Sequence, residues 1–373
     1  MKVTDIRMNP EILCELDAKV KLRPTKSFDL FYRLPDELAK FLQVSADPFI
    51  AALLIPSMRL GQTLTVDAPA SPTLLRTLPK IMAFYHSCDR RYKIIEVRTL
   101  QDRLESDPPS ESEALFFSGG LDSFHALTKL TEQNSETNNL THLLFVHGFD
   151  INLNDTILFQ KSRTAIESIA SGYGKKLVVV RTNVRELTDR NVGWNNCFGG
   201  AIASVALCFG GFFRHVYVAS DAGPNERILY SGSLPYVDGM IPPDLGALWS
   251  TGTTSLINCC YGISRIEKAR AVANNSLAQK YLRVCWENRN GAYNCGRCSK
   301  CIRTMLALHL AGVLSSFNFP TTLTSELVSA IDSSSDPIVT LHTEHLIHAL
   351  RERGENELAN ALSEASRKPS VGV

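Results

Sequence analysis

The chain has 373 residues, of which 44% are hydrophobic, so it is longer than one typical domain and apolar enough to bury a core. Its net charge of +1 excludes the strong basic excess that is typical of nucleic-acid and membrane surfaces. The start, Met1–Asp17, has no apolar signal segment, and the longest nearly apolar run, Ala201–Phe213, is too short to span a bilayer. We therefore expect two domains, no membrane partner and a cytoplasmic protein.

The first part of the chain indicates a mixed α and β unit. Apolar patches such as Phe28–Tyr32 and Phe49–Pro56 alternate with charged and proline-bearing turns. The polar stretch Asp107–Glu113 then predicts a linker, because it offers little to bury. We predict a smaller α+β accessory domain over residues 1–107.

A strand, a glycine turn and a helix are predicted after this linker. The apolar run Ala114–Phe117 predicts the strand, and Phe124, Leu127 and Leu130 recur at helical spacing. The turn between them, Ser118–Ser123, reads Ser-Gly-Gly-Leu-Asp-Ser. Such a turn directs backbone N–H groups and the positive end of a helix dipole at one point, which favours phosphate binding. The alternative is an ordinary Gly-Gly turn with a Ser/Asp helix cap.

This turn resembles the pyrophosphate loop of the ATP pyrophosphatase (PP-loop) superfamily, whose members split ATP into AMP and pyrophosphate. No lysine lies in the turn, so it is not a Walker-type loop. The resemblance implies that Ser118, Asp122 and Ser123 are catalytic, with ATP and Mg²⁺ as cofactors and Asp122 near the magnesium. The nucleotide-binding residues that it implies in the loop are Ser118, Gly119, Gly120, Leu121, Asp122 and Ser123.

Strands and helices are predicted to alternate after the loop. This alternation indicates a parallel twisted sheet with helices on both faces, and the superfamily resemblance implies an adenine nucleotide α-hydrolase-like fold. The predicted strands are 142–147, 177–180 and 215–219, and the predicted helices are 156–171, which Asp155 can cap, and a segment near 201–213.

Polar residues follow several of these strands, and the carboxyl ends of parallel strands meet at one edge of a sheet. His147 and Asp150 could line the adenine and ribose, while Asn183 and Asp221 could face the substrate or a metal. We predict His147 and Asn183 as cofactor-binding residues. Strand-end capping or solvation is the alternative for each of the four.

Two further groups could contribute chemistry. Cys197 or the pair Cys259-Cys260 could supply a nucleophile, although most free cysteines are buried as small apolar groups. A capping box, Ser264–Glu267, opens a helix that carries Lys268 and Arg270. These two cations could neutralise phosphate charge, or they could simply be solvated.

Four of the ten cysteines lie close together in the sequence. The spacing Cys-x9-Cys-x2-Cys-x2-Cys allows the thiolates to close a tetrahedral zinc site, and nearby Arg297, Lys300 and Arg303 would offset their charge. An iron–sulfur cluster is the main alternative. A closed four-sulfur site is structural, so we expect a zinc-pinned loop. The predicted metal ligands are Cys285, Cys295, Cys298 and Cys301.

Together, the loop and the cysteine pattern resemble the 7-cyano-7-deazaguanine synthase family over about Ala114–Leu310. The family's Tyr-Pro-Asp-Cys-Arg stretch has no clean match here. The resemblance implies adenylation of a carboxylate by ATP, followed by attack of ammonia to give an amide or nitrile. The chain begins Met1-Lys2, without the near-terminal cysteine of one class of glutamine amidotransferases, so free ammonia or a separate partner would supply nitrogen.

Three alternatives remain open: this ligase, a PP-loop enzyme that thiolates tRNA or modifies a protein through its N-terminal domain, and a non-catalytic nucleotide-binding protein. The predicted partners are accordingly a small carboxylate and ammonia, or a macromolecule, and a homodimer is one option. We predict a PP-loop domain over residues 114–315 and a helical C-terminal extension over 316–373, with a helix from about Thr343 to Ala365 interrupted at Gly354.

Overall fold

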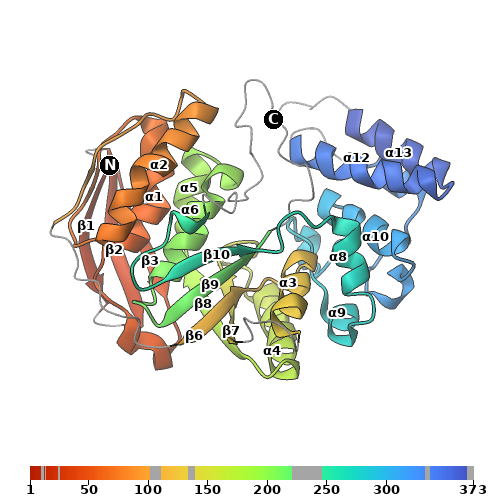
Figure 1. Ribbon diagram of the computed structural model, residues 1–373, viewed down its shortest axis with the longest axis horizontal. Coiled ribbons are helices and arrows are strands. Elements are labelled where there is room, and N and C mark those ends of the chain that lie inside the picture. The colour runs from red at the N-terminus through yellow and green to blue at the C-terminus, as the bar shows by residue number, and fades with distance from the viewer. Residues whose placement is uncertain are drawn as a thin grey trace.

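The computed structural model of the chain describes residues 1–9, 12, 14–23, 26–100, 111–132, 139–220, 246–331 and 337–367. Most of the predicted linker and the candidate Asp221 lie outside the described residues. Figure 1 shows a central sheet with helices on two sides of it. Within the described ranges, no helix combines the length and apolar character that crossing a bilayer requires.

The strands are β1 Lys2–Met8, β2 Glu15–Arg23, β3 Lys26–Arg33, β4 Leu64–Val66, β5 Val97–Arg98, β6 Ser112–Phe116, β7 Leu140–His147, β8 Lys176–Thr182, β9 Phe213–Ala219 and β10 Ser255–Cys259. They form one sheet in the order β10-β9-β6-β7-β8-β3-β2-β1-β4-β5. The block from β10 to β8 is parallel, β8, β3, β2 and β1 are antiparallel neighbours, and β4 and β5 continue parallel to β1. The prediction of an α/β fold is confirmed, and the predicted parallel sheet is present as a mostly parallel one that antiparallel N-terminal strands extend.

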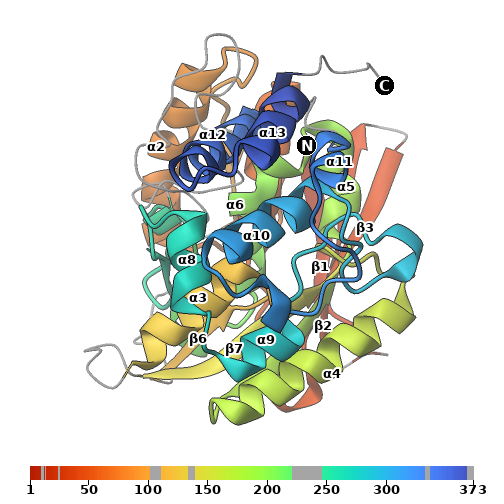
Figure 2. The same cartoon turned by 90° about the vertical axis from the view of Figure 1, so that its right-hand side faces the viewer.

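Helices cover both faces of this sheet (Figures 1 and 2). The helices are α1 Asp47–Leu60, α2 Pro72–Cys88, α3 Leu121–Thr131, α4 Thr156–Gly172, α5 Val184–Asn191, α6 Trp194–Leu207, α8 Arg265–Ala271, α9 Ser276–Tyr281, α10 Ser299–Leu310, α11 Ser325–Ser329, α12 Pro337–Glu352 and α13 Asn356–Arg367, with short 3₁₀ turns at Asp36–Phe41, Arg289–Gly291 and Leu314–Ser316. One core lies under α1, α2, α5 and α6, and the other under α3, α4 and α8 to α10.

Strand β6 shows why the sequence before the loop is continuously apolar. Ala114 and Phe116 belong to the first core, whereas Leu115 and Phe117 belong to the second. Because successive side chains of a strand point to opposite faces, a strand covered on both sides needs apolar residues at every position. The loop that follows β6 is therefore anchored in both cores.

The predicted elements that follow the loop are largely present. Asp155 caps α4 by accepting a hydrogen bond from Leu158 N at 3.1 Å. Both hydrogen bonds of the capping box between Ser264 and Glu267 are formed at the start of α8. The helix predicted near 201–213 is wrong at its end, because α6 stops at Leu207 and β9 begins at Phe213. Between α6 and β9, Gly210 and Gly211 both have positive φ angles, which an α-helix cannot accommodate.

The N-terminal segment is part of the same sheet. Strand β3 pairs antiparallel with β8, with Tyr32 opposite Thr182, and α1 packs on α6 within one core. The segments 1–107 and 114–315 therefore share a sheet and a core, although they were predicted as separate domains. The limits of these domains remain a prediction.

The predicted C-terminal helix is present as two helices, α12 and α13, which the turn at Gly354 separates. Figures 1 and 2 show this pair beside α10. The pair shares the second core with α10, and polar contacts add to it, because Arg353 donates to the Leu310 carbonyl at 2.7 Å and His309 pairs with Glu355. The C-terminal pair thus contacts the helix that begins at the cysteine cluster.

Candidate functional site

The predicted phosphate loop lies between the end of β6 and the first turn of α3. Gly119 has a φ of +79°, a conformation that favours glycine, and Gly120 is the N-cap residue of α3. No side chain caps the first turn of α3, which the structure describes in full. The amides of that turn can therefore bind an anion. The Ser123 hydroxyl instead donates to the Gly120 carbonyl at 3.0 Å, and Ser118 is half-buried.

Asp122 joins the loop to helix α8. Its Oδ1 lies 2.9 Å from Lys268 Nζ, and its Oδ2 lies 3.4 Å from an Arg265 terminal nitrogen. Lys268 is fully buried and also donates to the Ser220 carbonyl at 2.6 Å, at the end of β9. Burial alone would raise the pKa of Asp122, but the charges of Lys268 and Arg265 outweigh it and hold the pKa well below its usual range.

Buried arginines extend this positive region. Arg283 N donates to the Gly119 carbonyl at 2.8 Å, so its backbone supports the turn directly. Its side chain donates to Asn288 at 2.6 Å, and its buried Nε has no hydrogen-bond partner within the described part of the chain. Arg265 also donates to the Thr304 hydroxyl of α10 at 3.3 Å. Two buried cations, Arg265 and Lys268, therefore lie against one carboxylate whose side chain is 16% exposed, which leaves one positive charge in excess beside the loop.

Sequence reasoning found Lys268 but missed Arg265 and Arg283. Arg265 lies three residues before Lys268 on a capped helix, so the two share one face, and this spacing was a signal that could have been used. Arg270, which was considered with Lys268, is exposed. Only the tertiary structure brings Arg283 to the loop, because its contact depends on the course of the chain after α9.

Two residues predicted to bind the cofactor are held by other contacts. The ring of His147 stacks on Phe159 with 3.9 Å between ring centroids, and its Nε2 lies 3.1 Å from the Asn152 carbonyl. Burial lowers the pKa of His147, which favours a neutral ring. Asn183 donates to the Asp29 carbonyl at 2.8 Å and accepts from Phe31 N at 3.1 Å, so it bridges the end of β8 to β3.

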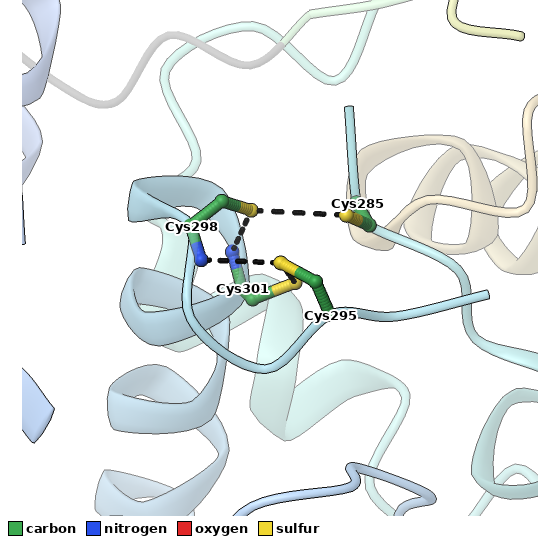
Figure 3. Close-up of side chains that lie close together, drawn as sticks. All are labelled: Cys285, Cys295, Cys298 and Cys301. Carbon is green, nitrogen blue, oxygen red and sulfur yellow. Dashed lines mark hydrogen bonds between the residues drawn. The ribbon is translucent and has the colours of Figure 1, made fainter. Parts of the chain in front are cut away.

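The four predicted metal ligands come together in a buried cluster (Figure 3). Their sulfur atoms all lie within 4.8 Å of one another, and the separations of Cys285 from Cys298 and of Cys295 from Cys301 are 3.9 Å. Backbone amides donate to three of the sulfurs, for example Cys298 N to Cys295 Sγ at 3.2 Å, which suits thiolates. The group could hold a metal such as zinc.

The cysteine cluster and the loop are mechanically connected. Cys285 follows Arg283, which supports Gly119, by two residues, and Cys298 caps α10, which carries Thr304 against Arg265. A metal held by the cluster would therefore fix the two segments that position the cations.

Among the other cysteines, Cys197 is buried in the first core. Burial raises the pKa of its thiol, which does not favour a nucleophile.

The chain was also compared with known proteins. No family model matches it, and neither curated proteins nor solved structures gave a significant match.

Proposed function

We propose that the protein is an AMP-forming, ATP-dependent enzyme that adenylates a carboxylate and then transfers the acyl group to ammonia. The main support is the position of Lys268 and Arg265. Asp122 holds both cations at the uncapped first turn of α3, which directly follows the glycine turn. Helix-terminal amides and fixed cations at one point suit a polyphosphate. The excess positive charge matches a pyrophosphate leaving group.

In this proposal the carboxylate oxygen attacks the α phosphate of ATP, and pyrophosphate leaves into the loop. Both oxygens of Asp122 are engaged by cations, so Asp122 acts by positioning Lys268 and Arg265. Lys268 Nζ would stabilise the departing charge from a buried position. Bound Mg²⁺ would neutralise further phosphate charge. Positioning and charge stabilisation then supply catalysis without an acid–base triad.

We also propose that the four cysteines bind one Zn²⁺. Zinc–thiolate bonds of about 2.3 Å place tetrahedral sulfurs about 3.8 Å apart, close to the 3.9 Å separations here. An iron–sulfur cluster would need more room, since several iron and sulfide atoms lie between its thiolates. With four protein ligands the ion has no open position, so its role is structural.

The substrate class follows from the resemblance to the 7-cyano-7-deazaguanine synthase family, which makes 7-carboxy-7-deazaguanine the first compound to test. Ammonia attack on the activated carboxyl carbon gives an amide, and a second adenylation of that amide with loss of AMP gives a nitrile. A macromolecular carboxylate bound through residues 1–107 is the alternative within the same chemistry.

The experiment measures AMP and pyrophosphate release by the zinc-loaded protein with MgATP and ammonium, with and without 7-carboxy-7-deazaguanine. Lys268→Met should lower the rate of AMP release at least about 100-fold, because the buried positive charge that would stabilise the leaving pyrophosphate is lost. Lys129→Met is the matched control. Lys129 also pairs with a carboxylate, Glu132 at 2.9 Å, but on the exposed end of the same helix α3.

The outcomes separate the candidates. Release that depends on the compound, with an amide or nitrile mass in the product, supports the proposal. If AMP is released whether or not the compound is present, adenylation is still supported, and protein and RNA substrates are tested next. No AMP under any of these conditions, or equal rates for the Lys268 and Lys129 variants, contradicts the proposed chemistry.

A further inference from the structure

The end of strand β10 presents a second reactive group beside the candidate site. Cys260 follows β10 directly and has a φ of +60°, a left-handed conformation that is rare for residues other than glycine. The turn is fixed by its neighbour, because the Cys259 carbonyl accepts from Ser220 N at 3.0 Å. Strained strand-to-loop turns of this kind concentrate at functional sites, where they expose a side chain at the sheet edge.

The surroundings of Cys260 suit a nucleophile. Its neighbours include His125 of α3, which lies one helical turn after Asp122, and Lys268 of α8. Helices α3 and α8 lie side by side in Figures 1 and 2. His125 is only 3% exposed, and its Nδ1 has no hydrogen-bond partner among the described residues. The mechanism described above uses neither His125 nor Cys260.

The electrostatics act in the same direction. The adjacent Cys259 thiol lowers the pKa of Cys260 most, burial opposes this shift, and His125 lowers the pKa further. The interaction between the two thiols raises the pKa of Cys259, which therefore stays protonated. Cys260 is half-buried, so a substrate can reach it, whereas the Cys259 thiol is directed at the Val218 carbonyl, 3.5 Å away. A reactive thiolate needs both stabilisation and access.

We propose that Cys260 is a covalent nucleophile that receives the acyl group from the adenylate as a thioester. This inference rests on the proposed adenylation. The Cys260 thiolate forms a C–S bond to the carbonyl carbon, the C–O bond to AMP breaks, and AMP leaves with the electron pair. Ammonia then forms a C–N bond, the C–S bond breaks, and the thiolate is regenerated while a proton passes to solvent. No oxidant or reductant is required.

The first test measures reactivity without a substrate. The zinc-loaded full-length protein is treated with limiting iodoacetamide at pH 7, and each cysteine peptide is quantified by mass spectrometry. Cys260 should be alkylated at least about tenfold faster than Cys88, a second half-buried cysteine whose pKa burial raises. Equal rates for Cys260 and Cys88 would overturn the assignment.

The second test detects the intermediate. Protein with MgATP and 7-carboxy-7-deazaguanine but no ammonium should gain the mass of the carboxylate minus water, and hydroxylamine should remove it. Cys260→Ser should abolish the adduct and slow product formation at least about 100-fold while still releasing pyrophosphate, the product of the adenylation step, in the first turnover. Cys88→Ser, remote from the site, should match the wild type.

The two proposals fail differently. If the wild-type protein releases no AMP, both the proposed adenylation and the proposed thioester are contradicted. AMP release with no adduct, or with normal turnover of Cys260→Ser, overturns the thioester alone. The adduct is measured on the wild-type chain, so a folding defect in the variant does not decide the result.

Discussion

At the scale of single residues, Asp122 determines the character of the site. It is a mostly buried carboxylate, 16% exposed, between two buried cations, and each partner is held by a second contact, Lys268 by Ser220 and Arg265 by Thr304. Removing one partner of such a group leaves charge buried without compensation, which costs far more than losing an exposed ion pair. Asp122 therefore links the stability of the fold to the geometry of the loop.

Asp122→Asn should lower the free energy of unfolding by about 3–5 kcal/mol at pH 7. The pKa of Asp122 is depressed in the folded chain, so its stabilisation is complete above the unfolded value of about 3.9 and is lost as the pH falls further, where only the unfolded state takes up the proton. Urea unfolding at pH 7, pH 5 and about pH 3 should show the gap between wild type and variant narrowing only below about pH 4.

Asp189→Asn is the control for this measurement. Asp189 also pairs with an arginine, Arg185, at 2.8 Å, but both side chains are partly exposed. We expect a loss within about 1 kcal/mol. A gap between wild type and Asp122→Asn that stays constant down to pH 3 would show that the carboxylate is not the stabilising group.

At the scale of elements, the segment from Leu282 to the first turn of α10 connects the cluster to the loop. Asn294 fixes this segment by accepting from Val284 N at 2.9 Å and donating to the Leu282 carbonyl at 2.8 Å. Arg283 lies between these two residues and contacts Gly119. A metal bound at the cysteine cluster, as proposed above, would therefore stabilise the segment that supports the loop.

Cys298→Ser should lose most of the bound metal and lower the unfolding temperature by several degrees, because the metal binds only the folded arrangement. Metal content by elemental analysis and thermal unfolding would be measured together, with Cys88→Ser as the cysteine control. A Cys298→Ser protein that kept its metal and its unfolding temperature but lost AMP release would contradict a structural role for the cluster.

At the scale of the whole molecule, one sheet joins the N-terminal strands to the parallel block that carries the loop. The N-terminal segment packs closely on the parallel block where α6 crosses α1, because a Cβ on Gly200 would lie 2.3 Å from the Ala51 carbonyl oxygen. Backbone at this distance cannot move aside as a side chain can. The N-terminal segment thus packs into the core beneath the site.

Gly200→Ala should reduce the free energy of unfolding by about 1–3 kcal/mol, because the added methyl group forces α1 and α6 apart. Gly172→Ala, at the end of α4, is the matched control. Its new Cβ would meet the side chain of Leu277, whose nearest atom is a methyl carbon that can rotate away, so we expect a change within about 0.5 kcal/mol. If chemical unfolding gave the same loss of free energy of unfolding for both variants, the close crossing of α1 and α6 would not be the cause of the loss.

The sequence by itself determined the features that depend on neighbours along the chain. The apolar run before Ser118, the caps at Asp155 and Ser264, and the spacing of the four cysteines each express a local rule of strand burial, capping or metal geometry. These rules hold over a few residues, so they need no knowledge of the fold.

Only the tertiary structure decided which distant side chains meet. Lys268 contacts Asp122 across a sequence separation of 146 residues, so it belongs to the candidate site. Asn183 contacts β3 across a separation of 154 residues, so it connects two strands instead. The N-terminal strands enter the sheet through the pairing of β3 with β8, and the fold brings Cys260, after β10, into interaction with His125 of α3. Strand order and helix packing set these contacts, and no local periodicity encodes them.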